Sequence, residues 1–105
     1  MQLLTWTDWL ASIPYYEAEK QQEHFATQVP PESVLVVDAV DRSRRMDRLA
    51  TDGMWNKPTW EGMDQEIRSL GFRNQPIFLR NDTHQLWFWG FWSHKEALLA
   101  ILKLT

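Results

Sequence analysis

Two acidic residues stand where carboxylates often do chemistry. Asp38 and Asp41 follow an apolar run that begins at Val34, at the end of a predicted buried strand. In α/β enzymes this position often holds carboxylates that bind a metal ion or act as a general base. Asp41 is also well placed to cap a helix over residues 42–51, and Asp38 to bond a neighbouring loop or an arginine. We favour these structural roles, and keep a carboxylate- or metal-dependent enzyme as a third hypothesis.

Other side chains that catalyse reactions or bind metals form no recognised pattern. His24, His84 and His94 are scattered, with no pair four residues apart and no His-Glu-x-x-His sequence. The chain has no cysteine, so thiol chemistry, disulfides and cysteine metal sites are excluded. A glycine-rich phosphate loop and a Gly-x-Ser-x-Gly elbow are also missing. We therefore predict no cofactor, no metal and no catalytic residues, and we favour binding over catalysis.

One basic cluster is a candidate for binding. Four arginines and three aspartates fall between positions 41 and 52, which gives this segment a net charge of +1. Such interleaving is typical of a solvated helix face with ion pairs three or four residues apart. Arginines beside aromatic rings are also typical of protein-binding hot spots, and of surfaces that contact phosphates and stack bases. The residues that we select as partner-binding are Arg42, Arg44, Arg45, Trp55, Lys57 and Pro76.

The composition limits the class of protein. At 105 residues, with a net charge of −3 and a pI near 5.5, the chain has no general attraction to nucleic acid or to an anionic membrane. Its first residues lack the basic segment and long apolar core of a signal peptide, and no stretch is long enough to span a membrane. We expect a cytoplasmic protein. Seven tryptophans are hard to bury in so small a chain, so we expect Trp6, Trp9 and Trp55 to be partly exposed.

The stretch from Leu86 to Trp92 organises the fold. Alternation along a strand sends Trp87, Trp89 and Phe91 to one face and the remaining large side chains to the other, with Gly90 as a gap. Because both faces are apolar, the pattern predicts a strand that is covered on both sides. Gly90 leaves space for another backbone or a helix to approach closely. Ser93 and Glu96 then predict a capping box at the start of a helix that ends near residue 104.

The other elements follow from apolar spacing and from turn residues. We predict a short helix capped by Thr5, helices over residues 15–28, 42–51 and 59–70, and strands over residues 34–40, 76–80 and 85–91. The last two strands form a hairpin, and the strand at 34–40 lies at the centre. The fold class is α+β, with a small mixed sheet covered by helices in one domain, 1–105, made of a short N-terminal helix over 1–13 and an α/β core over 14–104.

This order of elements resembles the thioredoxin-like fold, mainly over residues 71–104. The stretch from Gly71 to Ile77 is similar to the approach to the family's cis-proline, and Ser93 to Glu96 is similar to the start of its last helix. Where the family has its two cysteines, this chain has Asp41-Arg42-Ser43-Arg44, and one strand is missing or reduced. The resemblance implies that Pro76 is cis, beside a groove that would bind partners without redox activity.

We therefore predict a non-catalytic protein-binding module, such as an inhibitor, adaptor or assembly factor, which uses an aromatic and arginine surface. Its partner would be another protein, or a second copy of the chain. The alternative is a nucleic-acid-binding protein that uses the cluster from Arg42 to Arg48.

Overall fold

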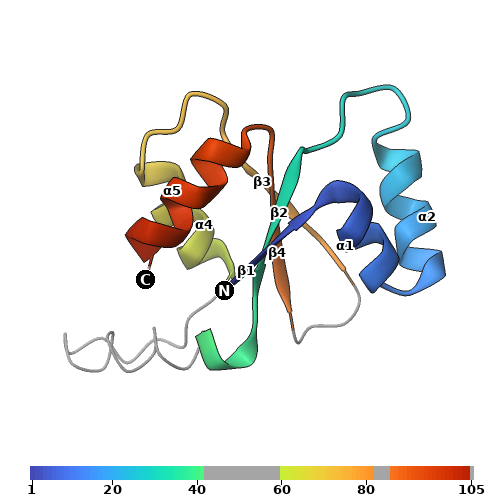
Figure 1. Cartoon of the computed structure of the whole chain (residues 1–105), viewed down its shortest axis with the longest axis horizontal. Helices are drawn as coiled ribbons and strands as arrows, with labels where there is room; N and C mark the ends of the chain where they lie inside the picture. Colours follow the sequence, from blue (N-terminus) through green and yellow to red (C-terminus); the bar gives the residue numbers. More distant parts are fainter. Residues whose placement is uncertain (42–59, 82–85, 105) are drawn as a thin grey trace.

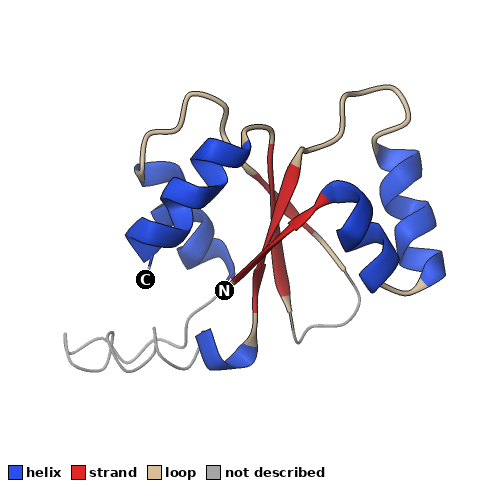
Figure 2. Cartoon of the chain, in the orientation of Figure 1, coloured by secondary structure: helices blue, strands red, loops and turns tan. Residues whose placement is uncertain are grey.

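The computed structural model describes residues 1–41, 60–81 and 86–104. The chain combines helices with an antiparallel sheet, which confirms the predicted α+β class (Figure 2). The elements are β1 (Gln2–Thr5), α1 (Trp6–Ser12), α2 (Tyr15–His24), β2 (Ser33–Val37), α4 (Trp60–Ser69), β3 (Ile77–Leu79), β4 (Trp87–Phe91) and α5 (His94–Leu104). Within these residues, no helix combines the length and the hydropathy that crossing a membrane requires.

The four strands form one sheet in the order β1-β2-β4-β3, and every neighbouring pair is antiparallel. The prediction of a mixed sheet is therefore wrong. Since β2 and β3 are both antiparallel to β4, they run in the same direction, as a helical crossover between them requires. The second strand of the hairpin, β4, lies between them and separates the two parallel strands. Strand β1 was not predicted at all, and it forms one edge of the sheet while β3 forms the other.

Helices cover both faces of the sheet. Figure 1 shows α1 and α2 on one side of the strands and α4 and α5 on the other. The predicted double cover of β4 is confirmed, because Phe88 packs into the cluster beneath α1 and α2 while Trp89 and Phe91 pack into the cluster beneath α4 and α5. Each of these three rings is at most 3% exposed. Burying rings of this size is the largest favourable term that a strand of five residues can supply.

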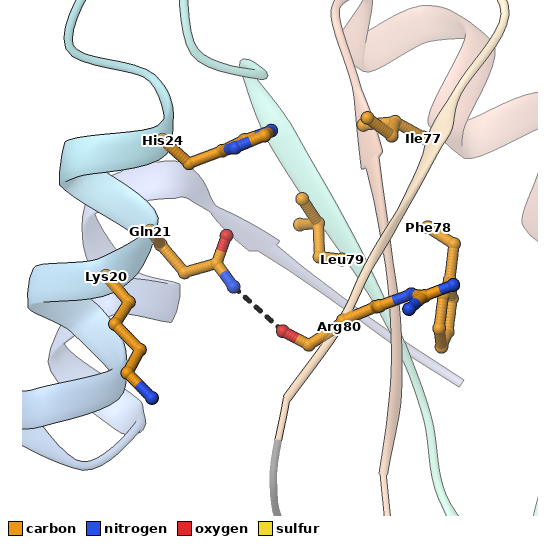
Figure 3. A pocket seen from close by; sticks show the side chains of 7 residues that line it. All are labelled: Lys20, Gln21, His24, Ile77, Phe78, Leu79 and Arg80. Carbon is orange, nitrogen blue, oxygen red and sulfur yellow. Dashed lines mark hydrogen bonds between the residues drawn. The ribbon is translucent and has the colours of Figure 1, made fainter.

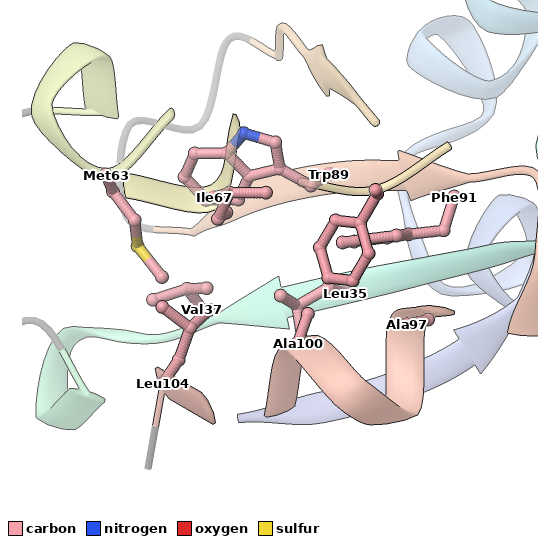
Figure 4. Close-up of a cluster of buried hydrophobic side chains, with 10 residues drawn as sticks. Leu35, Val37, Met63, Ile67, Trp89, Phe91, Ala97, Ala100 and Leu104 are labelled. Carbon is pink, nitrogen blue, oxygen red and sulfur yellow. The ribbon is translucent and has the colours of Figure 1, made fainter. Parts of the chain in front are cut away.

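The larger cluster joins β2 and β4 to the two helices of the C-terminal half (Figure 4). It includes Met63 and Ile67 from α4, as their helical spacing predicts, and Ala97, Ala100 and Leu104 from α5. Small residues on α5 let the helix lie close to the sheet. Helical spacing predicts that Ala97, Leu98, Ile101, Leu102 and Leu104 face the sheet as one apolar stripe. This prediction is partly wrong, because Leu98 is 46% and Leu102 73% exposed.

Two helix ends are as predicted. The Ser93 hydroxyl accepts a hydrogen bond from the Glu96 backbone N–H at 3.4 Å, at the start of α5, which is one half of the predicted capping box; Glu96 Oε2 has no hydrogen-bond partner among the described residues. After α4, the sequence predicts Gly71 at the C′ position, and its φ of 76° is the left-handed conformation that a glycine adopts there without strain. Phe72 follows it into the same cluster as Ile67.

Helix α2 is shorter than predicted and ends at His24 instead of residue 28. Phe25 leaves the helix and packs against Trp6 at a centroid distance of 5.2 Å, so burial of this ring outweighs continuation of the helix. Helical spacing predicts Tyr15 on the apolar side of α2, but this residue is 82% exposed.

Candidate protein-binding surface

Most of the selected partner-binding residues lie outside the described part of the chain. These are Arg42, Arg44, Arg45, Trp55 and Lys57, and their role remains a prediction. Pro76 is described, and its ring is fully buried immediately before β3. No cis peptide bond occurs among the described residues, so the expectation that Pro76 is cis is wrong. A partner that approaches here would meet the strand that follows Pro76 instead of the ring itself.

The two candidate catalytic carboxylates bind each other's backbone. Asp41 N–H donates to Asp38 Oδ1 at 2.9 Å, and Asp38 N–H donates to Asp41 Oδ2 at 3.2 Å. This is a capping box in which Asp38, and not Asp41 as predicted, is the cap, because β2 ends at Val37 and helical backbone begins at Ala39. Hydrogen bonding from the Asp41 backbone lowers the pKa of Asp38 below its ordinary value.

The other oxygen of the Asp41 carboxylate also has a partner. Asp41 Oδ1 accepts a hydrogen bond from the amino group of Met1 at 2.9 Å, and both side chains are largely buried. This contact connects the residue before β1 to the helical turn that follows β2. Within the described residues, no three acidic or histidine side chains gather as a metal site would require. The structure thus explains both aspartates by hydrogen bonds and an ion pair.

A serine–histidine pair was missed by the sequence analysis. Ser33 Oγ lies 2.9 Å from His94 Nδ1, although the two residues are 61 positions apart. Serine beside histidine is the arrangement of a nucleophile and its base. Ser33, however, is 2% exposed at the start of β2, which leaves its hydroxyl no room to meet a substrate. The pair instead connects β2 to the first turn of α5.

One of the three tryptophans that we expected to be partly exposed is buried. Trp9 is fully buried and packs against Phe88 at a centroid distance of 5.2 Å, so the prediction that it is exposed is wrong. Trp6 is half-buried on the same side of the sheet, and Trp55 lies outside the described residues. Trp60 and Trp87 are also half-buried, and both lie beside the edge strand β3.

A different group of aromatic and arginine residues, none of them among those selected from the sequence, lies together at β3. Trp60 of α4 stacks on Phe78 of β3, with centroids 4.2 Å apart and planes at 4°. The guanidinium of Arg80 lies 5.7 Å from the centroid of the Trp60 ring, a distance at which a cation and a ring attract each other. Among the described residues, no carboxylate forms an ion pair with Arg80. We call Trp60, Phe78 and Arg80 the β3 surface.

The backbone of β3 is flanked by two hollows, one on each face of the sheet. The first, of about 390 Å³, lies between α2 and β3 and is lined by Lys20, Gln21 and His24 together with residues 77–80 (Figure 3). The second, of about 350 Å³, is lined by the β3 surface and by Glu61, Asn81, Leu86 and Trp87. In the first hollow the Gln21 side chain donates to the Arg80 carbonyl at 2.9 Å. This carbonyl therefore faces α2 and not β4.

Successive side chains of β3 point to opposite faces of the sheet, and each hollow lies on one of these faces. Ile77 and Leu79 pack toward α1 and α2, whereas Phe78 packs toward α4 and Trp89. Figure 3 shows Arg80 on the same side of the strand as Phe78. Nothing in the sequence marked this surface, because Trp60 and Phe78 are 18 positions apart and each fits a stripe of core residues.

Comparison of the chain with protein-family models, curated proteins and solved structures finds no match. The resemblance to the thioredoxin-like fold therefore stays a prediction, and function is argued from geometry.

Proposed function

We propose that this protein is a non-catalytic protein-binding module and that its partner binds at the β3 surface. The observation that carries the proposal is the stack of Trp60 on Phe78, with the cation of Arg80 over the tryptophan ring. Arginine and tryptophan are the residue types most enriched in binding hot spots, where they combine apolar area with hydrogen-bond donors. Among the described residues no carboxylate forms an ion pair with Arg80, so its guanidinium can bind a carboxylate from another protein.

Other features of the molecule argue against catalysis and against nucleic-acid binding. For catalysis, the candidate carboxylates Asp38 and Asp41 already serve as a capping box, and the serine of the Ser33–His94 pair is buried. For nucleic acid, an arginine beside stacked rings fits bases, but the net charge of −3 opposes a polyanion. Protein binding needs no general positive charge, so it fits the surface and the composition together.

The test is affinity capture of partners by immobilised protein from extracts of the cells that make it. We expect Arg80→Ala and Trp60→Ala each to reduce the recovery of a specific partner about tenfold or more, the loss typical of a hot-spot residue. Leu102→Ala is the matched control, since Leu102 is an apolar side chain, 73% exposed, on α5. Equal recovery by the wild type, Arg80→Ala and Trp60→Ala would remove the β3 surface from the proposal.

The alternative has its own outcome in the same experiment. Should the protein retain a nucleic acid, its recovery would fall steeply with added salt, because phosphate contacts release counterions. Nuclease treatment of the extract would then abolish the recovery of any associated protein. Recovery that survives both treatments supports direct protein binding.

A further inference from the structure

Strand β3 forms one edge of the sheet, and among the described residues it has a neighbouring strand on one side only. It pairs with β4 through Ile77, Phe78 and Leu79, and no other described strand lies beyond it. An edge strand presents backbone N–H and C=O groups that a further strand can bind. Apart from the hydrogen bonds of the sheet, residues 77–80 make one further hydrogen bond within the described part of the chain, in which the Gln21 side chain donates to the Arg80 carbonyl. The described chain thus leaves the rest of this edge open.

Side chains two positions apart on a strand lie on the same face, and this fixes what an added strand would meet. Phe78 and Arg80 are two positions apart and point to the same side. A residue of the added strand beside Phe78 would lie on the stacked rings of Phe78 and Trp60. The residue two positions along would lie beside the guanidinium of Arg80, and the residue between them would face the hollow of Gln21 and His24.

We infer that the partner supplies an extended segment that joins the sheet at β3, with a large apolar residue and an acidic residue separated by one position. This inference rests on the proposed function and specifies the partner's chemistry. The apolar side chain packs on the Phe78 and Trp60 rings. The carboxylate binds Arg80, whose cation has no acidic partner among the described residues. Backbone hydrogen bonds to β3 supply affinity and the two side chains supply specificity, as in other cases of strand addition.

The probe is a capped seven-residue peptide in which threonine occupies the odd positions and tyrosine, glutamate and tyrosine the even ones. It has the same spacing in both directions, so it fits a parallel or an antiparallel arrangement. The control peptide has the same composition, with the glutamate moved by one position so that it points to the opposite face. We expect the first peptide to bind about tenfold more tightly than the control, since only its carboxylate reaches Arg80. Equal affinities would overturn the inference.

Two changes test the individual contacts. Arg80→Glu should weaken the glutamate peptide about tenfold and favour the same peptide with lysine in place of glutamate, because the charge pair is restored with its signs exchanged. N-methylation of alternate peptide nitrogens removes the N–H groups along one edge of the segment. We expect one methylated set to abolish binding and the other to leave it within about threefold, because an added strand uses one edge only. Any other pattern of methylation effects contradicts strand addition.

The amide resonances of residues 77–80 provide a readout that does not depend on a variant. They should shift when the glutamate peptide is added, and those of α5 should not. Binding of a single-stranded oligothymidylate, with no binding of either peptide, would assign the surface to nucleic acid and overturn the inference. If Arg80→Ala abolishes capture of a protein partner while the two peptides bind equally, strand addition fails and the proposed function stands.

Discussion

Trp60 lies flat against Phe78, with ring planes 4° apart and centroids 4.2 Å apart. This contact joins the first turn of α4 to the edge strand β3, and Phe78 in turn packs on the buried Trp89 at 5.1 Å. The stacked rings of Trp60 and Phe78, which would meet a partner, are therefore held in place by the core. A surface that is rigid before binding loses little conformational entropy when the partner arrives.

Substitutions in the β3 surface should separate binding from folding. We expect Trp60→Ala to lower the free energy of unfolding by about 2 kcal/mol, since it removes the stack and leaves a gap beside Phe78. Arg80 is exposed, so Arg80→Ala should change the free energy of unfolding by less than about 0.5 kcal/mol. Urea unfolding followed by far-UV circular dichroism measures both. A large loss of stability in Arg80→Ala would mean that its effect on binding reflects folding.

Asp64 supports the buried ring of Trp89. Its Oδ1 accepts from the indole Nε1 at 3.0 Å, and its Oδ2 accepts from Arg68 at 2.8 Å. We expect Asp64→Ala to cost about 1–3 kcal/mol of stability, because it leaves the indole N–H unsatisfied inside the protein. Asp64→Asn keeps an acceptor for the indole N–H and should cost less stability than Asp64→Ala.

The ion pair with Arg68 has its own control. Arg68→Ala should cost at most about 1 kcal/mol of stability, because the Arg68 side chain is 47% exposed. If Arg68→Ala proves as damaging as Asp64→Ala, the ion pair and not the indole bond is what matters.

Gly90 leaves the space that the Pro31 ring fills. A Cβ on Gly90 would fall 2.5 Å from Pro31 Cγ, closer than two non-bonded carbon atoms can approach. We expect Gly90→Ala to destabilise the protein by about 1–3 kcal/mol through overpacking. Adding Pro31→Gly, which removes the clashing ring, should make the penalty for Gly90→Ala smaller than in the wild-type background. A double-mutant cycle by thermal unfolding measures this coupling, and strict additivity would contradict the contact.

The capping box of Asp38 and Asp41 should make stability depend on acid. Hydrogen bonds from Asp41 hold the pKa of Asp38 below its ordinary value of 3.8 in the folded protein. The charged form of Asp38 therefore stabilises the fold above pH 3.8, and this contribution falls as the pH drops through the lower folded pKa. Asp38→Asn keeps the cap but removes the titration. The stability difference between wild type and Asp38→Asn, measured by urea unfolding, should be constant near neutral pH and should shrink below pH 3.8. A difference that does not change with pH would contradict the role of the Asp38 charge.

The sequence predicted best where burial decides structure. Strand β4 and the helix stripe of Met63 and Ile67 were found because large apolar residues repeat with the period of their element. The left-handed Gly71 and the Ser93 cap were found because those conformations favour particular residues.

The predictions failed where contacts with distant segments of the chain decide the local structure. Residues 2–5 form a strand because they pair with β2, some 30 positions away, and their own side chains show no alternation. Asp38 takes the cap because β2 ends at Val37, and no residue type marks that end. The β3 surface combines α4 with the edge of the sheet, so it exists only once the sheet order is known.

Site-specific photocrosslinking tests the location of the binding surface most directly. A photoreactive amino acid would replace Glu61, an exposed residue that lines the hollow beside Trp60, and separately Lys103, an exposed residue near the end of α5. On illumination in the cell, we expect the variant at position 61 to crosslink a partner protein and the variant at position 103 to crosslink none. Crosslinks from position 103 with none from position 61 would contradict partner binding at β3.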